Sequence, residues 1–423
     1  MEGRALRLLI VSFYFPPAGG GGVQRVLKLC RDLADLGIQV DVLAPDDSRF
    51  SARDPELVSA IPAGTTVHRA PYRGPSGETP AARLARTEGS GPRLALRARL
   101  AGRRLLLPDP EVAWVPDAVR VGTRVIRERS IDCILTTSPP SSAHLIGSAL
   151  ARRTGVRFVA DMRDSWLANP HRRYERRSVR AKRAVEERIA RRALGRADAI
   201  TAVTSFIARE AATLARPGTP LTVVPNGCDF DDFDGLAYTP GERLVVLHAG
   251  SFFGQRSPRP FLEAVAALDD PRVVARFLGD LRPADQAWAL DLGLGDRLEI
   301  DGFRPHRETL AAMKAADVLL LLVPRAGGRG LSILSGKVYE YLASERPILA
   351  LVPPEGAAAE LLNATGAAWI ADPDDSEAIL SSLRAARDAW ADGRLAERTL
   401  DPVWRERLDR RTRAAEMAEV LRG

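Results

Sequence analysis

Cysteine, histidine and aromatic residues are scarce in this chain of 423 residues. The three cysteines, Cys30, Cys133 and Cys228, lie far apart in the sequence, and neither they nor the five histidines have the spacing of metal ligands. This excludes a disulfide scaffold or a zinc ribbon and fits a reducing compartment. Long apolar runs are missing as well, because 318–323 is far shorter than the roughly 18 residues that span a bilayer. We therefore expect a cytoplasmic protein without a metal site.

Sequence signatures of several enzyme classes are also absent. No G-x-S-x-G segment and no Cys-His pairing argue for hydrolysis. The segment at 335–338 resembles the end of a P-loop, but the first glycine of that motif is missing and Val338 replaces its Ser or Thr. The glycine loop at 19–22 fails the dinucleotide fingerprint, because Gln24 or Arg25 stands at the last position. These departures exclude an ATPase.

The net charge of +7 is concentrated in two basic stretches. Residues 172–196 hold eleven basic residues against three glutamates, and 83–104 hold seven arginines against one glutamate. The pattern predicts a basic face, which is either a plain solvated helix surface or a surface for anionic lipid headgroups or a diphosphate-bearing substrate. Nucleic acid is a third option, but aromatic residues are scarce among these arginines and no nucleic-acid-binding signature occurs. We expect an anionic membrane surface as a partner, and no nucleic acid.

Short runs that are apolar throughout recur along the whole chain, with helical patterns between them. They are 6–13, 38–43, 131–136, 157–160, 199–203 and 221–224, followed by 244–249, 273–278, 298–300, 317–323 and 348–351. Such runs are typical of strands buried on both faces of a parallel sheet. The acidic, non-periodic segment 228–242 between the two series suits a linker.

We therefore predict an α/β protein with two doubly wound domains. The N-terminal domain spans 1–234, the C-terminal domain spans 235–400, and a helix over 401–423 packs back on the first domain. Ligands of such folds bind at the carboxyl ends of the strands, so the loops that follow strands are the places to search for a site.

Three of these loops carry groups that suit anions. The glycines at 19–22 lie between a strand and a helix, where backbone N–H groups cradle phosphates, although a packing turn explains them as well. Arg256 and Arg259 flank the loop after 244–249, where guanidinium groups suit phosphate oxygens and solvated arginines are the plain alternative. Lys337 and Glu340 lie in the first turns of a helix, and they suit a diphosphate and ribose hydroxyls, although a first-turn glutamate is commonplace.

A fourth loop combines two acids, an arginine and a tryptophan. Asp161, Arg163, Asp164 and Trp166 follow the run at 157–160. They form either a polar pocket for an acceptor or an internal salt-bridge knot, and the sequence does not decide between the two.

Taken together, these motifs resemble the GT-B glycosyltransferases, specifically the large retaining family 4, also called glycosyltransferase group 1. The similarity runs from Phe-Pro-Pro-x-Gly-Gly at 15–20 to the segment at 335–348. Its most specific parts are Pro-Asn-Gly-x-Asp at 225–229 and Lys-x-x-Glu-Tyr-Leu-Ala at 337–343. The resemblance implies a GT-B architecture of two Rossmann-like domains that face a central cleft. The second would hold a nucleotide diphosphate sugar and the first an acceptor, with no required cofactor.

The resemblance also implies roles for individual residues. Arg256 and Lys337 would be catalytic, neutralising the diphosphate, while Glu340 would bind the ribose and the backbone around 303–305 would frame the base. The glycines at 19–22 would close over the donor. The expected donor-binding residues are Gly19, Gly20, Gly21, Gly22, Gly250, Ser251, Phe303, Arg304, Ser335, Gly336 and Glu340. The expected acceptor-binding residues are Asp161, Arg163, Asp164 and Ser138.

Three positions depart from the family pattern. Ser332 stands where the family has the first of two glutamates spaced eight apart, and Ser251 stands where it often has an arginine. Many members place a histidine in the loop after 131–136, whereas His144 lies further along, in a helical stretch. We therefore assign no catalytic histidine.

The resulting expectation is an enzyme that moves a sugar from a nucleotide diphosphate donor to a lipid-linked or polysaccharide-precursor acceptor, with retention. The protein would be cytoplasmic and peripheral on the inner face of the membrane. Two alternatives remain open at this point: a nucleotide-sugar epimerase or hydrolase on the same fold, and a non-catalytic nucleotide-sugar-binding protein.

Overall fold

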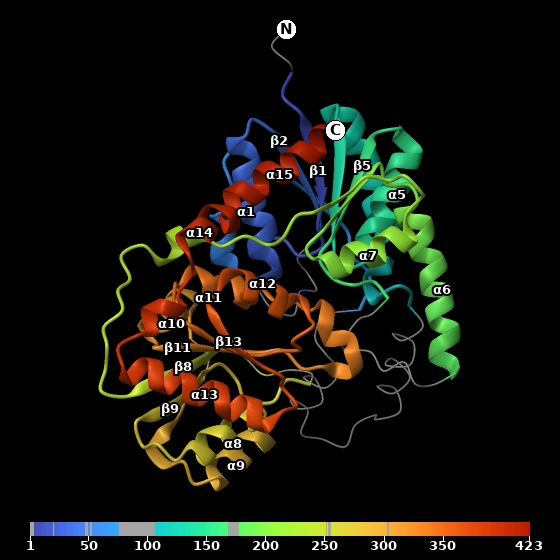
Figure 1. Ribbon diagram of the computed structural model, residues 1–423. Coiled ribbons are helices and arrows are strands. Elements are labelled where there is room, and N and C mark those ends of the chain that lie inside the picture. The colour runs from blue at the N-terminus through green and yellow to red at the C-terminus, as the bar shows by residue number, and fades with distance from the viewer. Residues whose placement is uncertain are drawn as a thin grey trace, which may run out of the picture. The chain divides into compact units, whose positions relative to one another are not determined.

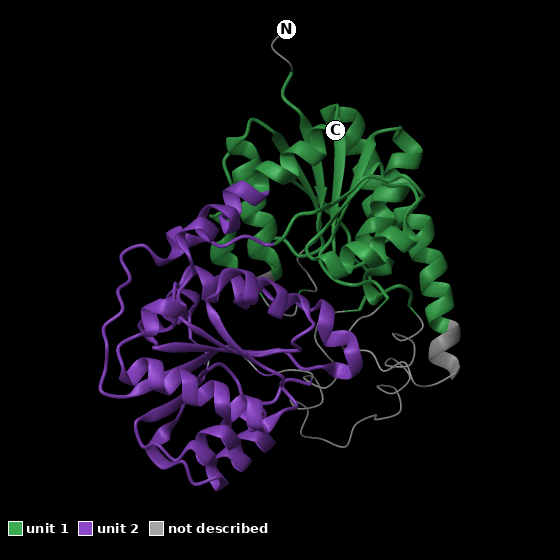
Figure 2. Ribbon diagram, in the orientation of Figure 1, with its two compact units in different colours: residues 1–167, 173–225, 414–423 green, residues 168–172, 226–413 purple. Residues whose placement is uncertain are grey.

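The structure is a computed structural model, shown in Figure 1. It describes residues 4–19, 21–46, 50, 53–75, 106–167, 177–250, 252, 255–302 and 304–423. The expectations for Gly20, Ser251, Phe303 and the basic stretch 83–104 therefore lie outside the described residues. The chain divides into two compact units, coloured separately in Figure 2. Unit 1 comprises described residues within 1–167, 173–225 and 414–423, and unit 2 those within 226–413.

Unit 1 is built on a parallel sheet of seven strands in the order β3-β2-β1-β4-β5-β6-β7. Its strands are β1 (Arg7–Val11), β2 (Gln39–Pro45), β3 (Thr66–Ala70), β4 (Cys133–Thr137), β5 (Arg157–Met162), β6 (Ala199–Ala202) and β7 (Leu221–Val223). Its helices are α1 (Gly21–Asp35), α4 (Val115–Arg129), α5 (Ser142–Thr154), α6 (Arg177–Leu194) and α7 (Ser205–Leu214). The strand order reverses at β1, which pairs with β2 on one side and β4 on the other.

Strand β1 shows why these runs are apolar throughout. Its alternate residues Leu9 and Val11 belong to one core cluster and Leu8 and Ile10 to another, and all four are fully buried. The first cluster contains side chains of α4, α5, α6 and α7 and the second those of α1, so both faces of the sheet are covered by helices. A strand covered on both faces has no position that faces water, which explains the absence of a regular polar alternation.

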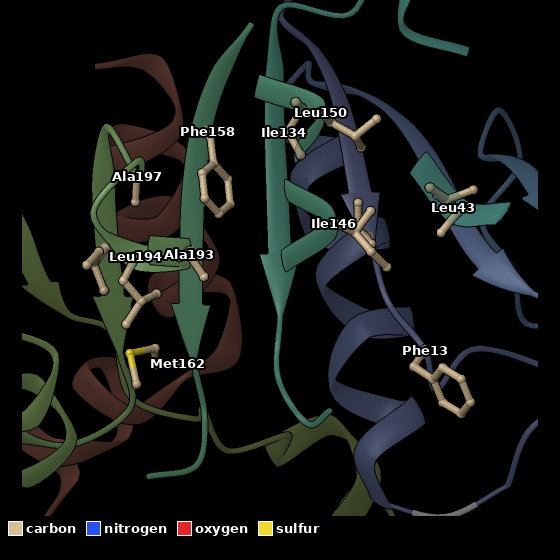
Figure 3. Close-up of a cluster of buried hydrophobic side chains, with 14 of the residues drawn as sticks. Phe13, Leu43, Ile134, Ile146, Leu150, Phe158, Met162, Ala193, Leu194 and Ala197 are labelled. Carbon is tan, nitrogen blue, oxygen red and sulfur yellow. The ribbon is translucent and has the colours of Figure 1, made fainter. Parts of the chain in front are cut away.

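Close packing in the first cluster is visible at Gly147 of α5. A Cβ at this glycine would overlap the ring of Phe158 and the methyl group of Thr136. Ile146 and Leu150 flank it on the same helix, and Figure 3 shows them with Phe158 of β5. The glycine thus allows α5 to lie directly against the sheet.

Unit 2 is built on a parallel sheet of six strands in the order β10-β9-β8-β11-β12-β13. Its strands are β8 (Leu244–Ala249), β9 (Val273–Leu278), β10 (Leu298–Gly302), β11 (Val318–Leu322), β12 (Ile348–Leu351) and β13 (Ala368–Ala371). Its helices are α8 (Arg259–Leu268), α9 (Pro283–Asp291), α10 (His306–Ala315), α11 (Gly336–Ala343), α12 (Ala357–Thr365), α13 (Ser376–Ala391) and α14 (Pro402–Leu408). The final helix, α15 (Arg410–Arg422), begins in unit 2, and its residues from Ala414 onward belong to unit 1.

Both sheets confirm the predicted α/β class with doubly wound parallel strands. Most predicted apolar runs coincide with strands to within a residue or two, and β3 and β13 are strands that the sequence reasoning did not include. Unit 2 starts at Asn226, before the predicted boundary at 234, because Cys228, Phe230 and Phe233 pack into its core. Among the described residues, no helix is long and apolar enough to cross a membrane.

Candidate functional site

The strand order of unit 2 reverses at β8, which pairs with β9 on one side and β11 on the other. In open α/β sheets ligands bind outside the carboxyl ends of the strands at such a reversal. Strand β8 ends at Ala249 and is followed by Gly250, and the loop after β11 leads to α11, which begins at Gly336. The residues around this point are therefore the first candidates for a site.

Lys337 of α11 reaches across to the end of β8. Its Nζ donates a hydrogen bond to the carbonyl oxygen of Ala249. Gly250 has a φ of 123°, a conformation that favours glycine, and a Cβ there would overlap the Lys337 ammonium group. Glycine is required here for two reasons, and the lysine charge is held where β8 ends.

Two buried side chains behind Lys337 hold the strands and the helix together. The Tyr341 hydroxyl accepts a hydrogen bond from the Ala249 N–H at 3.0 Å and donates one to the Leu320 carbonyl at 3.4 Å. His248 Nδ1 lies 2.8 Å from the same carbonyl, so this nitrogen carries a proton and donates. Burial and, to a smaller extent, the Lys337 charge lower the pKa of His248 to about 3, so the ring is neutral.

The site concentrates positive charge in a partly desolvated place. The pKa of Lys337 is lowered to about 8, chiefly by burial; the Glu340 carboxylate opposes this shift and nearby Arg256 adds to it. Burial also lowers the pKa of Arg256. Each of these cations disfavours the charged form of the other, because like charges repel. An anion with two charged groups would relieve this repulsion, so the pair is suited to such a ligand.

The loop that carries Arg256 is held in place by hydrogen bonds and ion pairs with α9 and the residue before it. The Arg256 carbonyl accepts a hydrogen bond from Arg282 Nη2 at 2.9 Å. Arg282 and Arg259 both pair with Asp285, at 2.5 and 2.9 Å, and the Arg259 guanidinium lies 4.9 Å from the ring centre of Trp288. Arg259, which the sequence offered as a phosphate contact, is thus engaged in the support of the loop.

The start of α11 adds a helix N-terminus to these cations. Ser335 is the N-cap residue and makes no side-chain capping hydrogen bond, and its buried Oγ has no hydrogen-bond partner among the described residues. A Cβ at Gly336 would meet nothing within 4 Å, so space is open at this helix end. The N-terminal end of a helix attracts anions through its backbone N–H groups.

The structure brings two of the expected donor-binding residues, Gly250 and Glu340, together with the two expected catalytic residues, Lys337 and Arg256. Arg304 lies 4.0 Å from Asp301 and next to β10, whose last residue is Gly302. The Gly302 carbonyl oxygen accepts a hydrogen bond from the Gly279 N–H at 2.7 Å. Sequence reasoning missed the roles of His248 and Tyr341. A histidine inside an apolar strand is the signal that could have identified the first, whereas Tyr341 resembles any core residue of a helix.

In unit 1, the glycine loop follows β1 and leads into α1. A Cβ at Gly22 would meet nothing within 4 Å, so packing does not require a glycine there. The Gly22 carbonyl accepts a hydrogen bond from Arg163 Nη1 at 3.3 Å. Arg163 in turn donates its backbone N–H to Ser138 Oγ at 3.2 Å. The loops after β1, β4 and β5 thus meet at one edge of the sheet.

Asp161 lies beneath this edge. Its carboxylate is fully buried and accepts hydrogen bonds from Thr137 at 2.8 Å, Thr201 at 2.9 Å and Arg25 at 3.4 Å. Of the two interpretations of this loop, the geometry of Asp161 supports the internal knot. Asp164, two residues beyond the strand, is exposed.

The loop after β5 is fixed by a residue that sequence reasoning did not find. Glu210 of α7 accepts hydrogen bonds from Ser165 Oγ at 2.6 Å and from the Trp166 N–H at 2.7 Å. A glutamate in the middle of a helix has no local signature for such a role. His144 is fully buried, contacts Thr136 Oγ1 through Nδ1 at 2.7 Å, and burial lowers its pKa to about 4.

Comparison with known proteins identifies the first half of the chain. Residues 20–227 match the family model described as Glycosyl transferase 4-like domain. The chain carries a glycosyltransferase 4-like domain. No curated protein matches the chain by sequence.

Solved structures with the same fold cover this chain along almost its whole length. Sucrose-phosphate synthase from Thermosynechococcus elongatus is 17% identical with a TM-score of 0.66, covering 99% of this chain and 98% of that chain. Anabaena HepE, in complex with UDP and glucose, is 17% identical with a TM-score of 0.64, covering 99% of each chain. A Listeria monocytogenes protein described as a UDP-N-acetylglucosamine 2-epimerase is 11% identical with a TM-score of 0.58, covering 99% of this chain and 96% of that chain. These similarities establish the GT-B architecture of two Rossmann-like units.

Proposed function

We propose that this glycosyltransferase takes its sugar from a nucleotide diphosphate donor held by unit 2. The observation that carries the proposal is the Lys337 ammonium group, held beside Gly250 at the strand reversal with Arg256 as a second desolvated cation. The diphosphate would lie against both cations and the start of α11. Glu340, one turn along that helix, would accept hydrogen bonds from the ribose hydroxyls.

In the proposed reaction, the bond between the sugar C1 and the diphosphate oxygen breaks while the acceptor hydroxyl oxygen bonds to C1 on the same face. The acceptor proton passes to the departing phosphate oxygen. Arg256 and Lys337 stabilise the negative charge that develops there. Transfer with retention follows from this use of the leaving group, because no side chain of the described site is placed as a general base. Inversion of the anomeric centre in the product would remove this mechanism.

We further propose that the acceptor is a lipid-linked or polysaccharide-precursor saccharide bound by unit 1. Ser138, Arg163 and Asp164 lie at the carboxyl edge of its sheet, where acceptor contacts are expected. The exposed arginines of α6 support a peripheral position on the cytoplasmic face of an anionic membrane.

The first test measures thermal unfolding with UDP, GDP, ADP and TDP and their sugar conjugates. A ligand at 100 times its dissociation constant stabilises the native state by about 2.7 kcal/mol. One nucleotide should raise the melting temperature, and Glu340→Ala should lose that shift. Glu377→Ala, which removes the first-turn carboxylate of α13 in the same unit, should retain it. The absence of a shift with every nucleotide would contradict the donor site.

Turnover separates a transferase from a binding protein. Arg256→Ala should lower kcat by about 10² or more if Arg256 stabilises the leaving group. Arg384→Ala, at an exposed position of α13, should leave kcat unchanged. Steady-state rates with the selected donor check this. A donor that is consumed or epimerised without any acceptor would instead indicate an epimerase or a hydrolase.

A further inference from the structure

Unit 1 has a pocket at the edge of its sheet opposite the loops after β1, β4 and β5. The pocket has a volume of about 810 Å³ and lies where β5 and β6 begin. Strand β5 alone is six residues long, which separates the two edges by about 20 Å at roughly 3.3 Å per residue. Figure 1 shows the helices α5, α6 and α7 together on one side of unit 1. The pocket is therefore distinct from the glycine-loop edge.

The lining comes from segments that are separate in the sequence. Helix α5 contributes Leu145, Ser148, Ala149 and Arg152, whose spacing of three, four and seven residues places them on one helix face. The end of α6 and the turn after it contribute Arg191, Arg192, Ala193, Gly195, Arg196 and Asp198, and the segment after α7 contributes Arg216. Arginines from these separate segments therefore meet around one cavity.

Most of this positive charge is not neutralised by neighbouring carboxylates. Arg191 pairs with Glu187 at 2.8 Å. Across the described part of the chain, no carboxylate lies within ion-pairing distance of the other four arginines, which are Arg152, Arg192, Arg196 and Arg216. Asp198 lines the pocket, but its Oδ2 already accepts the Phe158 N–H at 2.8 Å.

Helix dipoles do not account for all of the charge. Three helices, α5, α6 and α7, end beside the pocket, and each C-terminus has a partial charge of about −0.5. These three helix ends, together with Glu187 and Asp198, offset only part of the charge of the five arginines. Roughly one to two positive charges remain in excess. An uncompensated excess of this size matches the charge of one phosphate group.

The rest of the lining is apolar. Leu145, Ala149, Val156 and Ala193 form part of the wall. The pocket thus offers guanidinium donors beside an apolar surface, which suits a phosphate group, alone or attached to an organic body.

We propose that this pocket binds a phosphate-bearing anion. Guanidinium groups from separate segments would grip its oxygens through paired N–H donors. The phosphate is either part of a soluble compound or the headgroup of an anionic phospholipid. The pocket is lined by residues of unit 1, whereas the proposed donor site is built from residues of unit 2. The proposal therefore does not depend on glycosyl transfer.

The test compares two double variants of the full chain. Arg152→Ser with Arg192→Ser removes two arginines of the pocket. Arg153→Ser with Arg127→Ser removes two exposed arginines of unit 1, one from α5 and one from α4, that do not line it. Both variants lose the same charge and keep the donor site. Binding of pyrophosphate is measured by calorimetry at low salt, and binding to phosphatidylglycerol vesicles by sedimentation, with phosphatidylcholine vesicles as the neutral control.

The affinity of the pocket variant for its probe should fall by roughly tenfold or more, since this variant loses two charge-assisted contacts. The affinity of the control variant should change by less than about twofold. A pocket-specific loss with the vesicles identifies a lipid headgroup, and one confined to pyrophosphate identifies a soluble ligand. In addition, pyrophosphate or vesicles should protect Arg196 and Arg216 from phenylglyoxal, as read by mass spectrometry. Equal weakening in both variants, or no binding of either probe, would overturn the proposal.

Discussion

Lys337 shows how strongly the properties of one residue depend on its surroundings. In the sequence it is the lysine of an incomplete P-loop motif, whereas in the structure it is held by the Ala249 carbonyl above a glycine that leaves room for it. Burial makes its pKa low enough for its charge to vary near neutral pH. The protonation of this one residue therefore offers a direct test of the proposed donor site.

Nucleotide affinity should depend on pH through Lys337. The group binds an anion only when it is protonated, and its pKa in the free protein is about 8. Affinity should therefore be greatest below pH 8 and decline as the pH rises above it. Lys337→Arg keeps its charge to much higher pH, so its affinity should stay level from pH 7 to about 10. Calorimetric titration with the nucleotide selected above measures both profiles, and identical profiles would rule out this role for Lys337.

Helix α5 has two differently used faces, one in the core of unit 1 and one that lines the pocket. One side of it carries Ile146 and Leu150 against the sheet, with Gly147 between them where the helix and β5 are closest. Another face lines the arginine pocket. A single helix thus joins the core of unit 1 to a candidate binding surface.

Gly147→Ala should lower the free energy of unfolding by about 1–3 kcal/mol, because the new Cβ overlaps the Phe158 ring and the Thr136 methyl group. Gly122→Ala in α4 is the matched control. Its Cβ would lie 3.0 Å from a flexible Leu150 methyl group, and the gain in helix propensity, up to about 1 kcal/mol, offsets that contact. Urea denaturation followed by circular dichroism measures both, and equal stabilities would contradict the packing described for α5.

At the scale of the whole molecule, the chain enters unit 2 at Asn226 and returns to unit 1 at Ala414. The two connecting segments are bonded to each other within unit 2. The Cys228 N–H donates to the Leu408 carbonyl at 2.6 Å, and Arg410 pairs with Asp229 at 2.6 Å. A Cβ at Gly227 would overlap the Arg410 backbone. These contacts give a structural reason for the Pro-Asn-Gly-x-Asp motif.

The last residues of the chain are part of the core of unit 1. Leu421 is fully buried with Met417 and Ala418 among side chains of β1, β2 and α1. Leu421→Ala should therefore destabilise unit 1 by about 2–5 kcal/mol. Val403→Ala, at a position that is 63% exposed, should change stability by no more than about 0.5 kcal/mol. Hydrogen exchange of β1 and β2 localises the effect, and unchanged protection of these strands would contradict the packing of the C-terminal residues.

The sequence by itself determined the class of the fold and pointed to the loops that carry the proposed donor site. Strands buried on both faces need apolar residues at every position, so their runs were readable, and Gly250, Lys337 and Glu340 belong to loops and helix starts with local signatures. Only the tertiary structure decided which partners these residues have. The Lys337–Ala249 contact, the Asp161 knot, the Glu210 hydrogen bonds and the arginine pocket all join residues far apart in the chain. Such pairs leave no local pattern, because charge and hydrogen bonding depend on distance in space and not on distance along the sequence.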